Sequence, residues 1–514
     1  MSGDTNTGAE LLVGTAAARG VDVCFANPGT TEMPLVSALD AVPGVRAVLG
    51  VFEGVCTGAA DGYGRIAGRP AMTLLHLGPG LANGLANLHN ARRARSPIVN
   101  VVGDHASWHL PYDAPLTSDI AALAGTVGTV RTVASAETIG PDTAAAVDAA
   151  DDGVSTLIVP ADFQQQRVGA APPSGRGGQG GALRGVAMAR VETVAAKMRA
   201  GRSVLLLGGD ALSAEGLRAA AAIASATGAT LYSETFPACA ERGGGLPDAD
   251  RLPYFPEIAA RALAGADAVV LAGAAEPVAY FGYEGVPSLL APEGTVVRLS
   301  APGEDGTAAL SDLAAALDAR PVPARNEPAN DALPTGPLDG PNVGRIVAGL
   351  LPENAIVSVE GGTCGYPFVT ASASAPRHTV LTNTGGAIGQ GLPCALGAAI
   401  AAPDRTVIAL QSDGSALYTA QALWTMAREG TRVITLIAAN HKYNVLRTEL
   451  DRHGDAHGPQ ATALTSLADP SIDWVALAGS YGVPARRAAT GEDLAAALRA
   501  ALAEDGPQLI EMAL

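Results

Sequence analysis

Short apolar runs alternate with alanine-rich amphipathic stretches along most of the chain. Apolar runs separated by helical patterns are typical of strands that are buried on both faces of a parallel sheet. The pattern therefore predicts α/β domains built on parallel sheets. The candidate strands are residues 22–25, 45–51, 71–76 and 97–103, then 203–208 and 267–273, and finally 354–360, 405–411 and 432–439.

Two segments interrupt this pattern. Residues 169–185 and 320–342 are rich in proline and glycine and show no apolar periodicity, which is typical of linkers. They divide the chain into residues 1–168, 186–319 and 342–514. A chain of 514 residues also has room for about three domains of ordinary size. We therefore expect three consecutive doubly wound parallel-sheet domains.

The composition excludes several classes of function. Apolar residues make up 48% of the chain and charged residues 16%, which favours globular packing over disorder. With 33 basic and 50 acidic residues, the net charge of −17 argues against a nucleic-acid-binding protein. The two lysines, Lys197 and Lys442, do not lie in a GxxxxGK[ST] loop. This excludes a P-loop NTPase and argues against pyridoxal chemistry.

The cysteines and the N-terminus predict where the protein resides. Five cysteines are scattered along the chain without a CxxC pair, as in reduced cytosolic proteins. The first residues lack a basic segment followed by an apolar core, so we expect no signal peptide. Residues 381–403 contain five glycines and two prolines and would make a poor membrane span. We therefore expect a cytoplasmic protein with no membrane partner.

A strand–turn–helix–strand unit in the third part carries the strongest chemical signal. The strand at 405–411 leads into Ser412-Asp413-Gly414-Ser415 and a predicted helix at 416–429, and the next strand ends at Asn440. This arrangement places Asp413 and Asn440 at the carboxyl ends of neighbouring strands, where open α/β sheets bind ligands. A carboxylate and an amide oxygen suit Mg²⁺, and free N–H groups at Gly414 and Ser415 suit a diphosphate. The alternative is that Asp413 only caps the helix.

The first part contains a second group of candidate residues. Glu53 follows an apolar run and precedes a predicted helix at 54–68. A carboxylate in this setting is a candidate for a perturbed pKa, or simply a first-turn acid that the helix dipole favours. Two further loops, residues 27–31 and 76–80, follow strands in the same part. Three loops at one sheet edge indicate a site, although a lone histidine such as His76 is more often structural than catalytic.

Together these motifs resemble those of the thiamine-diphosphate enzymes of the acetolactate synthase and benzoylformate decarboxylase type. The metal signature of that family is GDG followed downstream by NN. Here it reads Ser412-Asp413-Gly414 and Ala439-Asn440, so each motif differs in one residue. Glu53 precedes the segment AADGYGRIAG, which is similar to the family's ADGYARA. NPGTTE (27–32), GPG (78–80) and DGSALYTAQALWT (413–425) also match, in the family's order.

The resemblance implies a role for each domain and two cofactors. Residues 1–168 would form a pyrimidine-binding domain, 186–319 a central Rossmann-like domain and 342–514 a diphosphate-binding domain. Thiamine diphosphate and Mg²⁺ would be the cofactors. The implied metal ligands are Asp413, Asn440 and the backbone carbonyl of Lys442. The implied cofactor contacts are Glu53, which activates the cofactor, Ile388, which supports its bent conformation, and Thr363, Gly414 and Ser415.

The resemblance also implies a reaction. A 2-oxo acid would lose CO₂ to give an enamine, which is released as an aldehyde or attacks a second carbonyl to give an acyloin or acetohydroxy acid. His76 matches one of the two active-site histidines of such decarboxylases, and Phe281 stands where the second is expected. Thr30 matches a substrate-side hydroxyl, so Thr30, His76 and Phe281 are the expected substrate pocket. His441, beside Asn440, has no assigned role.

Three further expectations follow from the resemblance. Acetolactate synthases hold FAD in the central domain and the decarboxylases do not. The weak glycine signal at 208–210 and the short chain lead us to expect no FAD. We expect a homodimer or homotetramer, because family members share each site between two subunits. The alternative functions are a non-catalytic regulatory paralogue that binds thiamine diphosphate, which Glu53, Asp413 and Asn440 argue against, and a nucleotide-binding oxidoreductase.

Overall fold

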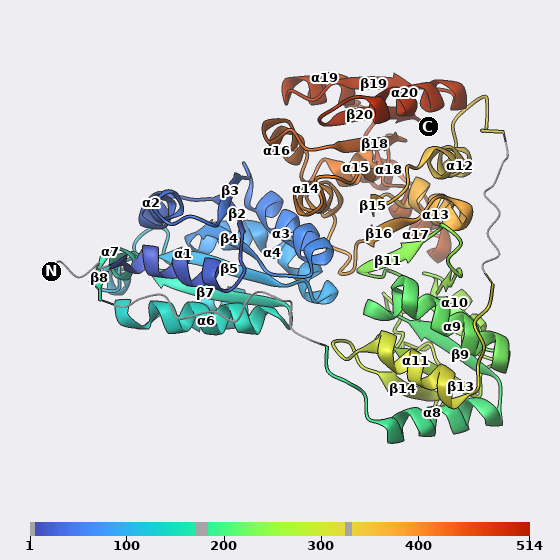
Figure 1. The fold of residues 1–514 in the computed structure, drawn as a ribbon. Coiled ribbons are helices and arrows are strands. Elements are labelled where there is room, and N and C mark those ends of the chain that lie inside the picture. Colours follow the sequence, from blue (N-terminus) through green and yellow to red (C-terminus); the bar gives the residue numbers. More distant parts are fainter. Residues whose placement is uncertain (1–5, 170–182, 324–331) are drawn as a thin grey trace.

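The computed structural model describes residues 6–169, 183–323 and 332–514, and it confirms the predicted α/β class with three main sheets (Figure 1). The N-terminal domain is blue to cyan in the figure, the central domain green to yellow, and the C-terminal domain mostly orange to red. Parts of both predicted linkers, residues 170–182 of the first and 324–331 of the second, lie outside the described residues. Among the described helices, none combines the length and apolar character that a membrane span requires.

The N-terminal domain is a parallel sheet in the order β3-β2-β4-β5-β7-β6. Its strands are β2 (Val23–Asn27), β3 (Arg46–Leu49), β4 (Ala71–His76), β5 (Ile98–Asp104), β6 (Thr129–Thr132) and β7 (Val154–Pro160). Its helices are α1 (Gly8–Ala18), α2 (Met33–Ala41), α3 (Glu53–Ala67), α4 (Leu77–Ala94), α5 (Ile120–Gly125), α6 (Ile139–Ala150) and α7 (Ala161–Gln165). A short antiparallel pair, β1 (Asn6–Thr7) and β8 (Arg167–Val168), joins the two ends of the domain.

The central domain is a smaller parallel sheet in the order β12-β10-β9-β13-β14. Its strands are β9 (Ser203–Leu207), β10 (Thr230–Ser233), β12 (Asp250–Arg251), β13 (Ala268–Ala272) and β14 (Val296–Ser300). Its helices are α8 (Met188–Ala200), α9 (Ala214–Thr227), α10 (Pro256–Leu263) and α11 (Gly306–Ala316). The chain order reverses between β9 and β13, which is where such sheets have their binding crevice.

The C-terminal domain has a sheet in the order β11-β16-β15-β17-β18-β20-β19. It is parallel except for β11, which comes from the central part of the chain and pairs antiparallel with β16. The strands are β11 (Cys239–Arg242), β15 (Ala355–Val359), β16 (His378–Thr382), β17 (Val407–Ser412), β18 (Val433–Ala439), β19 (Ala485–Ala488) and β20 (Gln508–Ala513). The helices are α12 (Gly340–Leu350), α13 (Gly362–Ala371), α14 (Gly391–Ala401), α15 (Asp413–Ala416), α16 (Ala422–Glu429), α17 (Asn444–His453), α18 (Pro459–Thr465), α19 (Trp474–Ser480) and α20 (Gly491–Ala503).

The helix predicted at residues 416–429 is not continuous, so this prediction was wrong in detail. α15 ends at Ala416 and α16 begins at Ala422. In between, Thr419 donates its hydroxyl hydrogen to the backbone carbonyl of Gly389, at 2.8 Å. This hydrogen bond holds the turn against a loop of the same domain. The helical pattern of the sequence does not indicate such a contact.

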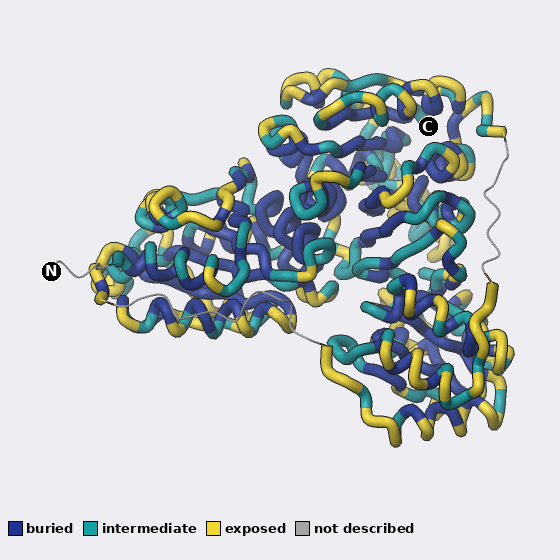
Figure 2. Tube along the Cα trace, in the orientation of Figure 1, coloured by how far each residue is buried: buried dark blue, intermediate teal, exposed yellow. Residues whose placement is uncertain are grey.

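Helices α3 and α14 join the N-terminal domain to the C-terminal domain. They cross in direct backbone contact, because a Cβ atom at Gly62 would lie 2.0 Å from the carbonyl oxygen of Cys394, and one at Gly397 1.8 Å from that of Ala59. Only glycine permits this approach. Buried residues of both domains form one continuous apolar cluster here, visible as dark tube between the two domains in Figure 2. The two domains are therefore packed as one body.

Candidate functional site

Asp413 bridges the ends of two neighbouring strands. β17 and β18 are adjacent and parallel, so Asp413 and Asn440 follow them at the same edge of the sheet. The carboxylate of Asp413 is 1% exposed; it accepts the backbone N–H of Gly414 at 2.8 Å and that of His441 at 2.6 Å. Burial raises the pKa of Asp413 above its ordinary value, and these hydrogen bonds oppose the rise. The predicted adjacency of the two strand ends is thus present.

Asn440 and Thr363 complete this group. The amide nitrogen Nδ2 of Asn440 donates to Oγ1 of Thr363 at 3.3 Å, and its Oδ1 accepts the N–H of Lys442 at 3.1 Å. Thr363 lies in α13, which follows β15, the neighbour of β17. The backbone carbonyl of Lys442 accepts the N–H of Asn444 at 3.1 Å. Four predicted residues therefore gather at one edge, although each oxygen already has a hydrogen-bond partner.

The donor set at this edge suits a hard cation. It offers one carboxylate, one amide oxygen and one backbone carbonyl, and Mg²⁺ is bound in proteins through one or two carboxylates with other oxygens and substrate phosphates. Among the described residues, no group of three or more His, Cys, Asp or Glu side chains could hold a metal ion. The oxygen donors of Asp413, Asn440 and Lys442 themselves are of the kind that Mg²⁺ takes.

Gly414 and Ser415 differ in what they can offer a diphosphate. A Cβ atom at Gly414 would lie 2.5 Å from the Tyr443 ring, so the ring packs directly on the backbone. The Ser415 hydroxyl donates to the carbonyl of Ser412 at 3.0 Å and accepts its N–H at 3.3 Å. Because this hydroxyl already caps the turn, backbone N–H groups are the better candidates for phosphate contacts.

Ile388 stands on a loop that its own domain holds firmly. The loop spans residues 383–390 between β16 and α14, and Ile388 is 39% exposed. Glu360, directly after β15, forms hydrogen bonds with this loop, and burial raises the pKa of its carboxyl. It accepts hydrogen bonds from the backbone N–H groups of Gly389, Gln390 and Gly391 and from the side chain of Asn383. Sequence reasoning missed Glu360, which has no motif of its own.

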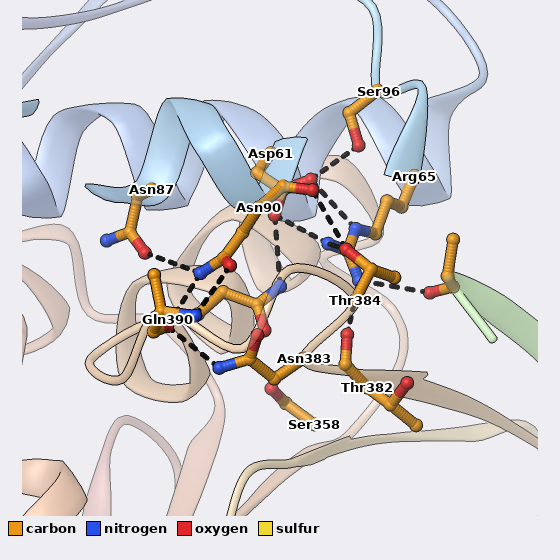
Figure 3. A network of polar contacts seen from close by, with 12 residues as sticks. Asp61, Arg65, Asn87, Asn90, Ser96, Ser358, Thr382, Asn383, Thr384 and Gln390 are labelled. Atoms are coloured by element: carbon orange, nitrogen blue, oxygen red, sulfur yellow. Dashed lines mark hydrogen bonds and ion pairs between the residues drawn. The ribbon is translucent and has the colours of Figure 1, made fainter. Parts of the chain in front are cut away.

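Residues of the N-terminal domain also form hydrogen bonds with the loop that carries Ile388 (Figure 3). Asn90, on α4, exchanges two hydrogen bonds with the backbone of Ala387, at 2.7 and 3.1 Å. The amide of Gln390 donates to Asp61 on α3 at 3.0 Å. Arg65, also on α3, donates to the carbonyl of Thr382 at 2.7 Å and to that of Ala238, in the central part of the chain, at 3.2 Å. The position of Ile388 thus depends on contacts from two domains.

Glu53 begins α3 at the edge of the N-terminal sheet. Its carboxylate accepts a hydrogen bond from the amide of Asn83 at 3.0 Å. A Cβ atom at Gly80 would lie 3.2 Å from this carboxylate and 3.4 Å from Cβ of His76, so Glu53 and His76 flank the same glycine.

His76 is paired with a buried acid that sequence reasoning missed. Its Nδ1 lies 2.8 Å from Oε2 of Glu32 and 3.2 Å from the hydroxyl of Thr31. Glu32 is completely buried, whereas the His76 side chain is 23% exposed. Thr30, the predicted substrate-side hydroxyl, is exposed, and its neighbour Thr31 makes the contact with His76. The signal for Glu32 was present at the end of the NPGTTE motif.

Phe281 lies in the segment between β13 and β14 and is 58% exposed. Nearby, the hydroxyl of Tyr283 donates to Glu449 at 3.1 Å. Glu449 is on α17, the helix that follows Lys442. This hydrogen bond attaches the segment that carries Phe281 to α17, and the role of Phe281 in a substrate pocket stays a prediction.

A cavity of about 740 Å³ lies at the carboxyl ends of the strands of the central domain, and residues of the N-terminal domain such as Arg95 and Asp152 also line it. Glu234 lines it and accepts the N–H of Ala275 at 3.0 Å, and burial raises the pKa of this carboxyl to about 7. A Cβ atom at Gly208 would lie 2.6 Å from the Glu234 carboxyl carbon, so this acid covers the glycine turn after β9. The expected absence of FAD stays a prediction.

Comparisons with known proteins match both outer domains. Residues 6–123 match the N-terminal TPP binding domain of thiamine pyrophosphate enzymes, and residues 362–512 match their C-terminal TPP binding domain. A Mycobacterium tuberculosis protein named "Putative acetolactate synthase large subunit IlvX" is 52% identical, over 98% of each chain. Benzoylformate decarboxylase of Pseudomonas aeruginosa is 31% identical, over 96% of each chain. The chain belongs to the thiamine pyrophosphate enzyme family.

Solved structures agree with this assignment. The thiamine diphosphate-dependent 4-hydroxybenzoylformate decarboxylase of Rhodococcus jostii superposes with a TM-score of 0.83 at 26% identity, over 98% of each chain. Glu53 and His76 lie in the matched N-terminal domain, and Thr363, Ile388, Asp413 and Asn440 in the matched C-terminal domain. Phe281 lies in neither. As a thiamine pyrophosphate enzyme, the chain thus has candidate residues in both cofactor-binding domains.

Proposed function

We propose that this chain is a thiamine-diphosphate- and Mg²⁺-dependent 2-oxo acid decarboxylase with carboligase activity, related in function to acetolactate synthases. The observation that carries the proposal is the meeting of Asp413 and Asn440 at neighbouring strand ends, beside Thr363. It occurs in a chain that is 31% identical to a benzoylformate decarboxylase over nearly its whole length. The bound cofactor would supply the carbanion on which a 2-oxo acid loses CO₂.

The chain's own residues would hold and activate this cofactor. Asp413, Asn440 and the backbone carbonyl of Lys442 would bind Mg²⁺, and the N–H groups near Gly414 would face the diphosphate. Ile388 would support the bent cofactor, because its loop is fixed from two sides. Glu53 would hold a proton at the aminopyrimidine ring and so promote loss of the proton that activates the cofactor.

Each complete site would need two chains. The family resemblance implies that each cofactor site is shared between two subunits, so Glu53 of one chain and Asp413 of another would serve one cofactor. We therefore propose a homodimer or homotetramer in which the N-terminal pyrimidine domain (1–168) of one subunit meets the diphosphate domain (342–514) of another. The central domain (186–319) would supply Phe281. The unpaired cysteines fit a reducing, cytoplasmic compartment.

The residues near the substrate would decide the product. After CO₂ is lost, the substrate carbon takes either a proton, which gives an aldehyde, or a second carbonyl, which gives an acyloin or acetohydroxy acid. The imidazole of His76 can donate a proton to the substrate carbon, but the phenyl ring of Phe281 cannot. With one proton-relaying side chain in place of two, aldehyde release should be slow and carboligation appreciable, on a small or apolar 2-oxo acid.

The test is a panel of 2-oxo acids that includes pyruvate, longer aliphatic acids and benzoylformate. CO₂ and organic products are measured separately, with and without thiamine diphosphate and Mg²⁺, for the wild type and Phe281→His. We expect cofactor-dependent CO₂ release and a carboligation product, with more free aldehyde from the variant. Free aldehyde alone from both proteins would refute the partition argument. Cofactor binding without turnover of any acid would favour the non-catalytic alternative.

A further inference from the structure

The geometry of the His76–Glu32 pair determines which ring nitrogen of the imidazole carries hydrogen. We propose that Glu32 is a positioning residue: it holds the proton of His76 on Nδ1 and thereby presents Nε2 to the substrate carbon. This inference rests on the proposed function for its effect on turnover. The arrangement of the pair itself can be tested in the protein without cofactor.

The contacts of Glu32 restrict the movement of its own side chain and of the His76 ring. Its carboxylate accepts the backbone N–H of Gly29 at 2.8 Å and the hydroxyl hydrogen of Thr31, besides its contact with His76. A Cβ atom at Gly103 would lie 1.9 Å from Oε1 of Glu32, so the carboxylate rests directly on the backbone of β5. A buried carboxylate that is hydrogen-bonded on both oxygens cannot turn away without leaving those donors unpaired.

The imidazole ring is equally confined. A Cβ atom at Gly29 would lie 2.3 Å from the ring of His76, so the ring lies flat against the backbone of this glycine. An ionised carboxylate only accepts hydrogen bonds, so the contact with Glu32 requires hydrogen on Nδ1. The hydroxyl of Thr31 donates to Glu32 and can accept the same Nδ1–H. Nδ1 is therefore committed to Glu32 and Thr31.

The other ring nitrogen of His76, Nε2, remains available for proton transfer. Among the described residues, Nε2 of His76 has no hydrogen-bond partner, and the side chain keeps part of its surface exposed. His76 and Glu53 flank Gly80, so the histidine lies on the side where the cofactor would be activated. In the proton step, the imidazolium N–H bond at Nε2 breaks and a C–H bond forms at the substrate carbon. The neutral imidazole keeps hydrogen on Nδ1, and solvent restores the proton at Nε2.

Glu32→Leu is the decisive variant, because it keeps the approximate size of the side chain and removes both acceptor oxygens. Without the carboxylate beside Nδ1, the hydrogen of the neutral ring is no longer held on that nitrogen. Glu32→Asp keeps the charge but shortens the reach. Asp40→Asn, at an exposed carboxylate of the adjacent helix α2, is the matched control. Thermal unfolding and thiamine diphosphate affinity are measured for each protein, so that loss of fold is recognised.

The first readout is ¹⁵N NMR of histidine-labelled protein without cofactor, with the His76 signal assigned through His76→Ala. We expect hydrogen on Nδ1 in the wild type and in Asp40→Asn, and a shift toward the Nε2–H form in Glu32→Leu. Hydrogen on Nε2 in the wild type, or no change in the variant, would overturn the proposal. This readout holds even if the wild type turns over no 2-oxo acid, in which case the proposed function alone fails.

The second readout is turnover of the 2-oxo acid selected by the panel. Glu32→Leu should lose about 10²-fold in kcat, the lower end of what general acid–base assistance contributes, with cofactor affinity unchanged. Glu32→Asp should recover part of this loss. In a His76→Ala background, Glu32→Leu should cost nothing further in kcat, because the two residues act as one unit. Additive losses in the double variant would show that Glu32 acts on the fold and not through His76.

Discussion

The carboxylate of Asp61 and the guanidinium of Arg65 form two parallel hydrogen bonds, at 2.8 and 2.7 Å, one turn apart on α3. Neither side chain is more than 1% exposed. Because Arg65 also binds carbonyl groups of the central and C-terminal parts, this pair links three regions of the chain. Such bidentate pairs combine strength with fixed geometry. The pair therefore supports the loop that carries Ile388.

Removing one partner of this pair should destabilise the protein strongly. Asp61→Asn leaves the buried guanidinium of Arg65 without its counter-charge, which typically costs about 3–5 kcal/mol. Urea unfolding should show this loss. Asp152→Asn, which breaks the ion pair with Arg95 at the surface, is the control and should cost less than about 1 kcal/mol. Equal losses in the two variants would contradict the role given to the Asp61–Arg65 pair.

The role proposed for Glu53 predicts a selective defect. Glu53→Gln keeps the hydrogen-bonding shape but removes the carboxylate that would promote cofactor activation. Exchange of the cofactor's C2 hydrogen for deuterium should slow by about 10²–10⁴-fold, while thiamine diphosphate still binds. NMR of the exchange, beside titration calorimetry of binding, checks both. An exchange rate near that of the wild type would exclude this role for Glu53.

The role proposed for Asp413 predicts a defect in binding instead. Asp413→Ala removes the carboxylate that would hold Mg²⁺ against the diphosphate, so calorimetry should detect no binding of thiamine diphosphate with Mg²⁺. The circular dichroism spectrum should stay close to that of the wild type. Asp404→Ala, at an exposed carboxylate of the same domain, should bind normally. Unchanged affinity in Asp413→Ala would refute the metal assignment.

His378 predicts a pH dependence of stability. It is 1% exposed, its Nδ1 lies 2.8 Å from the carbonyl of Pro376, and burial lowers its pKa from 6.5 to about 4. Between these two values the unfolded chain binds the extra proton, so stability falls as the pH is lowered. One pKa unit corresponds to about 1.4 kcal/mol, so the loss from pH 8 to pH 5 is about 2 kcal/mol.

The variant His378→Phe, beside Phe368, should lack this contribution. The free energy of unfolding in urea, measured at pH 8 and pH 5, should therefore fall by about 2 kcal/mol less in the variant than in the wild type. The contributions of carboxylates that titrate in both proteins cancel in this comparison of unfolding free energies. An identical pH dependence of the two proteins would show that His378 is not held neutral in the fold.

The sequence predicted those parts of the site that follow from local order. Asp413 and Asn440 follow consecutive strands joined by a helical crossover, and such strands are commonly neighbours in a parallel sheet. Their adjacency could therefore be inferred from the chain order. Glu53 was found in the same way, since it directly follows an apolar run and begins a helix.

The remaining contacts depend on features that an apolar pattern does not contain. Glu32 meets His76 because β2 and β4 are neighbours in a register that places Asn27 opposite Leu75. Gln390 meets Asp61 because α3 and α14 cross at glycines, which fixes how two domains dock. Both contacts join polar residues far apart in the chain. The pattern of buried positions specifies which face of an element is inside, but not which polar partners meet there.

Subunit complementation tests most directly the central claim, that one thiamine diphosphate site is built from Glu53 of one chain and Asp413 of another. Chains carrying Glu53→Gln and Asp413→Ala are co-expressed with different tags, and the mixed dimer is isolated. One of its two sites then combines an intact Glu53 with an intact Asp413. The account predicts cofactor-dependent CO₂ release from the mixed dimer and almost none from either homodimer. A mixed dimer as inactive as the two homodimers would contradict it.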